Sequence, residues 1–464
     1  MHQLHITLTA FLGAFAAAAP VGDDAIVQVE PRSRSPFAMP LCNGIKIEDA
    51  TINELQRWMI LKHLSSEDLV SCYIDRIKQT NGYLRSISEI NPDALSIAAS
   101  LDKERSKKGI RGPLHGIPFL VKDNFYTDDK HNTSEGGLVL LGGRYSREAT
   151  VVSKIRAAGG VLLGHCALSE AADHRALVNF SDGYSTRVGQ TRNPYNLTQL
   201  TSGSSGGSSV AVAINQAAYI PNVKTIANPY GFGQPDDIPE EYGQLITYNT
   251  LLAVGYGEWL QNWTFHKTDE RHGMKSLAEM AAWNDAHNSS TGALGNSTWW
   301  FNTASGQDFY DNAIATNGTM GDVFWKAFNW GRRTAREAID GGHAYVLANG
   351  TVIELDALIV PNDNGGGGDS ACASIPSYAG YPVASVPIGQ NGFDVPCGMC
   401  IYGRQWSEAT LIRVASAMDD LFQWSAKPKW HNYKTAKGPW EAKWPGYACS
   451  HESLDRYACE EEES

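Results

Sequence analysis

Gly116–Asn124 reads Gly-Ile-Pro-Phe-Leu-Val-Lys-Asp-Asn, and Thr201–Ser209 reads Thr-Ser-Gly-Ser-Ser-Gly-Gly-Ser-Ser. The first stretch is a short apolar run that ends at Lys122, which predicts a buried strand with a lysine at its end. The second is a cluster of glycine and serine that leads into the small-residue run Val210–Ile214, which predicts a helix. Serine hydroxyls and a lysine base both occur in acyl-transfer sites, so the two stretches together indicate a serine hydrolase. Lys122 can serve as its base only where burial or a nearby cation lowers its pKa.

Around these stretches, predicted helices alternate with short apolar strands. Thr51 and Glu54 have the spacing of a capping box, and Ser65 or Ser66 starts a second helix. The other expected helices are Asn91–Arg105, Ala149–Ala158 and Ser407–Phe422, and the expected strands are Ile117–Val121, Val161–Leu163, Leu355–Val360 and Pro382–Val386. Residues 231–308 are expected to be irregular, with one helix around Met274–His287. This alternation predicts an α/β fold.

The composition predicts one large domain rather than a string of modules. The chain has 464 residues, of which 42% are hydrophobic, so it can bury a large core. Its net charge is −12 and it has no dense basic stripe, which argues against a nucleic-acid partner. The expected partner is a small-molecule or peptide substrate.

The beginning of the chain predicts secretion. Ile6–Ala19 is an apolar run with small residues before Pro20, which is typical of a cleaved signal peptide over residues 1–19 and too short for a membrane span. Eight Asn-x-Ser/Thr sequons support an extracellular glycoprotein. They begin at Asn132, Asn179, Asn196, Asn262, Asn288, Asn296, Asn317 and Asn349.

The cysteines favour disulfides rather than metal or redox chemistry. There are eight, an even number, which in an oxidising compartment indicates disulfide bonds whose pairing the sequence leaves open. Cys397 and Cys400 have the spacing of a zinc or redox half-site, but no second pair accompanies them at metal-ligand spacing. A local bridge between Cys449 and Cys459 is expected, and no cofactor or metal is.

The serine cluster also permits a second interpretation. Gly203–Gly207 fits Gly-x-Ser-x-Gly with Ser205 at its centre, the nucleophile elbow of α/β-hydrolases, which would make Ser205 a substitute nucleophile. That motif needs a strand directly before it and an acidic residue and a histidine after it. The preceding Asn193–Ser202 is polar and turn-like, so the elbow is the weaker hypothesis.

Seven stretches, taken in order, resemble the amidase signature family. They are Pro113–Asn124, Glu148–Glu170, Gly189–Tyr195, Gly203–Ala213, Leu355–Pro361, Ala379–Gly389 and Gly403–Leu411. The resemblance implies hydrolysis of amide C–N bonds by a Ser, cis-Ser, Lys triad, on a mixed β-sheet core flanked by helices on both faces. Carried over by position, Lys122 is the base, and Ser204 is the bridging cis-serine that relays a proton between the lysine and the nucleophile.

The block that should carry the nucleophile is missing. The family places this serine, and the backbone N–H groups of the oxyanion hole, in a later block that resembles Gly-Thr-x-x-x-Gly-Ser. Here the chain instead reads Pro221–Gly231, and Asn228 stands at the corresponding spacing. Without the nucleophile and the oxyanion donors we expect no amide hydrolysis, and the sheet is left incomplete.

Two explanations of this gap stay open. In the first, which we favour because the flanking blocks match the family closely, a coding segment near residues 220–221 is omitted from an ordinary amidase. In the second, the loss is real and leaves a non-catalytic protein that still binds ligand. We expect a signal peptide over residues 1–19, a surface arm over 20–45, an amidase-like domain over 46–430 and a polar acidic tail over 431–464.

Overall fold

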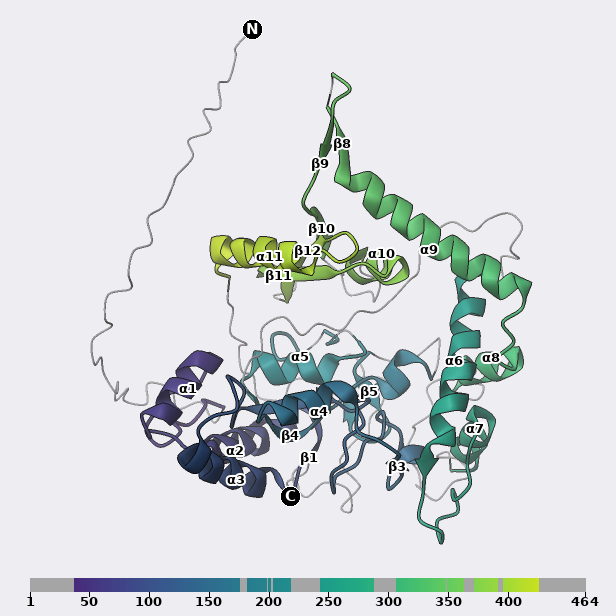
Figure 1. Ribbon diagram of the computed structural model, residues 1–464. Coiled ribbons are helices and arrows are strands. Elements are labelled where there is room, and N and C mark those ends of the chain that lie inside the picture. Colours follow the sequence, from purple (N-terminus) through teal and green to yellow (C-terminus); the bar gives the residue numbers. More distant parts are fainter. Residues whose placement is uncertain are drawn as a thin grey trace.

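The computed structural model describes residues 37–175, 182–197, 199–201, 203–217, 243–287, 306–347, 349–362, 371–390 and 395–424 (Figure 1). The expected signal peptide, the acidic tail and Pro221–Gly231 lie outside these residues. So do Cys449, Cys459 and three of the sequon asparagines, Asn179, Asn288 and Asn296.

The first half of the chain forms a small mixed sheet between helices. Its strands are β1 (Ile87–Ile90), β4 (Val161–Cys166) and β2 (Pro118–Lys122), and its helices are α1 (Ile52–Ile60), α2 (Ser66–Leu84), α3 (Ala94–Lys108), α4 (Thr150–Ala157) and α5 (Gly206–Ala213). β4 lies in the centre, antiparallel to β1 and parallel to β2. Alternate residues of β4 face opposite ways: Leu163 packs in the core formed with α1, α2 and α3, whereas Leu162 packs against Val152 of α4. The expected arrangement, with helices on both faces, is confirmed.

The second half builds another sheet and a group of helices. The sheet is β10 (Leu358–Asn362), β12 (Pro396–Tyr402) and β11 (Val383–Gln390), all antiparallel, and the helices are α6 (Gly243–Gln261), α7 (Leu277–Ala286), α8 (Asp308–Thr316), α9 (Asp322–His343), α10 (Ala371–Ala379) and α11 (Glu408–Phe422). Cys400 packs in a core with residues of α9 and α10, and the adjacent Ile401 packs with residues of α11, so this sheet is also covered on both faces. In Figure 1 the long α9 runs from the α6–α8 helices to the second sheet.

The described strands do not form one continuous sheet. The two three-stranded sheets share no hydrogen-bonded pair, and the other described strands form the two-stranded pairs β3 (Arg144–Tyr145) with β7 (Trp263–Thr264), β5 (Tyr184–Ser185) with β6 (Gly189–Gln190), and β8 (Ala344–Val346) with β9 (Val352–Glu354). Within the described residues, the sheet of the fold is thus in two parts.

The expectation of irregular structure after residue 231 is wrong where residues are described. α7 matches the expected helix, but the 19-residue α6 was not predicted. Gly255 and Gly257 lower its helix propensity, and it has no charged face that would produce a helical pattern. Packing against α8 and α9 stabilises this helix, so tertiary contacts override the local signal.

The described end of the expected surface arm is anchored to the body. Cys42 is fully buried and forms a disulfide with Cys72 of α2, and the Phe37 ring lies 5.0 Å from that of Tyr83. A second disulfide joins Cys372 of α10 to Cys400 of β12. Cys397 is a free thiol and Cys400 is already paired, so these two cysteines do not form the half-site that their spacing suggests.

Candidate active site

Lys122 ends β2 and lies next to the serine cluster. The strand pairs with β4 so that Lys122 is opposite Cys166, and the lysine side chain is buried. Its Nζ atom donates a hydrogen bond of 2.6 Å to the Oγ atom of Ser204, 82 positions later in the chain. The two residues that the sequence singled out are therefore in direct contact.

Close packing holds Ser204 in this position. Its carbonyl oxygen accepts a hydrogen bond of 3.0 Å from the Ser169 N–H, and the peptide bond between Gly203 and Ser204 is cis. A Cβ atom at Gly203 would lie 2.5 Å from the Asp173 carboxylate, and one at Gly207 would lie 2.3 Å from the Ala167 carbonyl oxygen. The glycines of the cluster are thus needed for close approach rather than for flexibility.

The helix after the cluster begins earlier than expected. α5 starts at Gly206 rather than at Val210, and Ser205 is its N-cap residue. The Gly207 N–H donates to the Ala167 carbonyl oxygen at 3.2 Å, so one of the N–H groups at the start of this helix is used in packing. Within Thr191–Ser205, the residues that the structure describes contain no strand, so Ser205 lacks the strand–turn–helix setting of a nucleophile elbow.

Burial and two carboxylates set the charge of Lys122. Burial lowers the pKa of Lys122 to about 8, and Asp173 and Glu135 act in the opposite direction because they stabilise the ammonium form. Burial, and to a smaller extent Asp182, raises the pKa of Asp173 to about 7. Burial likewise raises the pKa of Glu135 to about 7, although Lys122 and a hydrogen bond from Tyr256 oppose this. Burial therefore brings the pKa values of Lys122, Asp173 and Glu135 to between about 7 and 8.

Asp173 lies on a strained turn. Ala171, Ala172 and Asp173 all have left-handed backbone conformations, with φ of 52°, 55° and 71°. Each non-glycine residue in this region costs roughly 1–2 kcal/mol. The buried Arg175 after the turn donates to Glu170 before it at 2.6 Å, so an ion pair spans the turn. Strain of this kind is typical of functional loops.

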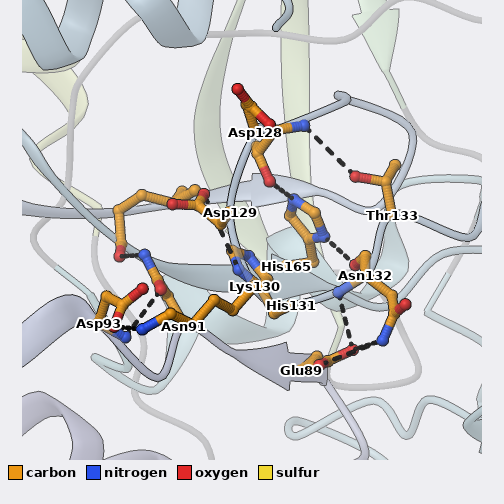
Figure 2. A network of polar contacts seen from close by, with 12 residues as sticks. Glu89, Asn91, Asp93, Asp128, Asp129, Lys130, His131, Asn132, Thr133 and His165 are labelled. Carbon is orange, nitrogen blue, oxygen red and sulfur yellow. Dashed lines mark hydrogen bonds and ion pairs between the residues drawn. The ribbon is translucent and has the colours of Figure 1, made fainter. Parts of the chain in front are cut away.

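A buried polar network fixes the loop between β2 and Glu135. Asp123 accepts hydrogen bonds from Ser134 and from the Gly136 N–H, and it pairs with Arg187 and His165. Burial opposes ionisation of Asp123, but the Arg187 charge and the His165 and Ser134 hydrogen bonds hold its pKa below the usual range. Figure 2 shows the adjoining part of this network, in which Asn132 lies between the His165 ring and the Glu89 carboxylate.

The sequence did not identify Asp173 or Glu135 as site residues. Glu135 follows Ser134 in a loop, and Asp173 lies just after the Leu168–Glu170 motif, so no spacing rule marks either one. Asn228, which stands where a nucleophile would be expected, lies outside the described residues. Among the described residues, no three histidine, cysteine or acidic side chains are grouped so that they could hold a metal ion. No helix there is long and apolar enough to cross a bilayer.

Comparison with protein families links the site region to amidases. The family model described as Amidase matches residues 68–219, which include Lys122 and Ser204. A Schizosaccharomyces pombe protein that carries the name amidase is 31% identical over 547 aligned residues, which cover 89% of this chain and 92% of the relative. An Arthroderma benhamiae protein, also named as an amidase, is 44% identical over 191 residues, covering 37% of this chain and 32% of the relative.

Solved structures agree with the sequence relatives. The native peptide amidase from Stenotrophomonas maltophilia superposes with a TM-score of 0.65 and 26% identity, covering 83% of this chain and 99% of that one. Another similar structure is the same enzyme type in complex with the competitive inhibitor chymostatin, with a TM-score of 0.64 and 27% identity, covering 83% of this chain and 100% of that one.

Proposed function

The chain belongs to the amidase signature family, and from that premise we propose that Lys122 and Ser204 form the proton-relay half of a site for amide C–N hydrolysis. The hydrogen bond of 2.6 Å between Lys122 Nζ and Ser204 Oγ is the observation that carries the proposal. The neutral lysine accepts the Ser204 proton, and Ser204 then accepts the proton of the attacking serine. General-base relays of this kind contribute about 10²–10⁴-fold to a rate.

Protonation of Lys122 controls the relay. With a pKa of about 8, a minority of the lysine is neutral at pH 7, and the neutral fraction grows as the pH rises through 8. An ordinary lysine, with a pKa of 10.5, becomes half neutral only near pH 10.5. Burial beside Ser204 therefore supports a base that works near neutral pH.

The chain as written lacks the attacking serine in our proposal. The family's nucleophile block would follow Ile220, where this chain has Pro221–Gly231. The alignment with the Schizosaccharomyces pombe relative extends over 547 positions, more than the 464 residues of this chain, so the relative contains residues that have no counterpart here. This difference supports the absence of a segment from the chain, which both explanations of the gap share. Sequencing the transcript across Ile220 to Asn222 tests the omission, and a continuous message without an insertion would overturn it.

Substrates are proposed to be small-molecule or peptide amides. Two of the similar solved structures are peptide amidases, and one binds a competitive inhibitor. Their identity to this chain, 26% and 27%, supports the substrate class rather than a particular substrate.

A restored chain tests the relay. The variant replaces residues 218–242 with the corresponding segment of the Schizosaccharomyces pombe relative, and release of ammonia from a peptide amide is measured. We expect turnover in the restored chain, and a loss of at least about 100-fold in both its K122A and its S204A forms. The neighbouring S205A substitution is the matched control and should retain activity. Loss of activity in S205A with retention in S204A would contradict the relay and favour the nucleophile elbow.

We also propose that the protein is secreted and N-glycosylated. Two disulfides in the described residues fit an oxidising compartment, and the sequon residues Asn317 and Asn349 are exposed. Asn132 is an exception, because its amide donates to Glu89 and its Oδ1 atom accepts from the Gly142 N–H. Glycopeptide mass spectrometry should therefore find glycans at Asn317 and Asn349 and an unmodified Asn132.

A further inference from the structure

Glu135 is tied by its backbone to the end of the strand that carries Lys122. Its N–H donates to the Asp123 carbonyl oxygen at 3.0 Å, and its own carbonyl oxygen accepts from the Ala171 N–H at 2.9 Å. The residue has a left-handed conformation, with φ of 50°, which is uncommon for glutamate. These two bonds hold Glu135 between β2 and the turn that carries Asp173.

A tyrosine from the later helices bonds the Glu135 side chain, and a second tyrosine lies beside the first. The Tyr256 hydroxyl, on α6, donates to Oε2 of Glu135 at 2.7 Å and lies 3.4 Å from the hydroxyl of Tyr310, on α8. Both tyrosines are buried. The carboxylate near Lys122 is thus oriented by a helical region that is distant in sequence from the lysine.

The charged groups around this pair come from several elements. Asp173 and Glu135 both favour the charged form of Lys122. Glu135 in turn is affected by Tyr256 of α6, and by Asp123 and Lys122 at the end of β2. Since the Tyr256 hydrogen bond stabilises ionised Glu135, the packing of α6 can influence the lysine through this carboxylate.

We propose that Glu135 is a positioning residue that, held by Tyr256, contributes together with Asp173 to the charge environment of Lys122 and so links the α6–α8 helices to the relay. This inference rests on the proposed function, because it assigns Glu135 a role in the use of Lys122 as a base. Glu135 does not react itself. Ionised Glu135 favours the ammonium form of Lys122. A weaker Tyr256 contact would let Glu135 take up a proton, and Glu135 would then no longer stabilise that ammonium form.

Titration of Lys122 by competitive acetylation tests the proposal without any need for turnover. The full chain is labelled with trace acetic anhydride between pH 6 and pH 11, and mass spectrometry of the Lys122 peptide gives the midpoint of its reactivity. We expect a midpoint near pH 8 for the parent chain. E135Q should lower it by about one pH unit, because an opposite charge is lost. Y256F should lower it by less, because Glu135 remains but ionises at a higher pH.

Two control variants separate this effect from general perturbation. Y145F removes a hydroxyl from a nearby ring that stacks on Trp259, and E104Q removes an exposed carboxylate that bonds Arg111. Both should leave the midpoint unchanged.

An unchanged or raised midpoint in folded E135Q would overturn the proposal. If E135Q does not fold, an unchanged or raised midpoint in folded Y256F would overturn the proposal. The proposed relay fails by a different result, retention of amide hydrolysis by S204A in the restored chain, so the two failures can be told apart.

Discussion

At the residue scale, the contact between Lys122 and Ser204 joins two motifs that are 82 positions apart. The sequence predicted these two residues because each lies in a recognisable pattern, an apolar strand and a glycine-rich cluster. Asp173 and Glu135 could not be predicted in the same way. Their effect on Lys122 arises because two loops fold against the end of β2. A single acidic residue in a loop belongs to no periodic sequence pattern that would mark it.

The raised pKa of Asp173 predicts that the stability of the protein depends on pH. Its pKa is about 7 in the folded protein, against an ordinary value of 3.8, so the folded state holds more protons than the unfolded state between about pH 4 and pH 7. Stability contributed by this group is therefore present at low pH and is lost as the pH rises through that window. D173N keeps the shape without the charge, so we expect it to raise the free energy of unfolding at pH 8 by about 1–2 kcal/mol.

Urea unfolding of both proteins at pH 4 and pH 8 measures this difference. At pH 4 the parent carboxyl is neutral, so the two should be nearly equal in stability. A D173N variant that is less stable than the parent at pH 8 would refute the assignment.

At the element scale, the sequence predicts the helices that carry a start signal or an apolar period, whereas it does not predict α6. α1 and α2 begin with capping boxes at Thr51 and Ser65, which are visible in the sequence. α6 contains three glycines and no such signal, and it forms because α8 and α9 cover it. The start of α5 was misplaced for a related reason: Gly206 and Gly207 suggest a loop in the sequence, but they lie in the first turn, where the helix approaches Ala167.

Two glycine-to-alanine substitutions test this account of α5. G207A adds a Cβ atom 2.3 Å from the Ala167 carbonyl oxygen and 2.5 Å from that of Ser86, both backbone atoms that cannot turn away. We expect it to lower the free energy of unfolding by roughly 2–4 kcal/mol. G255A in α6 is the matched control: nothing lies within 4 Å of its added Cβ, so it should raise that free energy by about 0.5–1 kcal/mol. Equal effects of the two substitutions in urea unfolding would show that helix propensity, and not close packing, governs Gly207.

At the scale of the whole molecule, the described residues contain the elements that support the proposed proton relay. The first sheet and its helices bring Lys122 and Ser204 together, and the later helices reach Glu135 through Tyr256. The second sheet is well packed on both faces but shares no strand pair with the first within the described residues. The fold class was predictable from the alternation of helices and strands. We propose that the division into two sheets reflects the segment after Ile220 that the resemblance marks as missing.

We propose that this chain holds a folded proton relay without a nucleophile. The most direct test exposes the full chain to a fluorophosphonate probe and to a peptide amide, after acetylation has shown that Lys122 titrates near pH 8 and the site is therefore formed. We expect no labelled serine and no release of ammonia above the uncatalysed rate. Robust labelling of Ser205, together with hydrolysis that depends on Lys122, would contradict it.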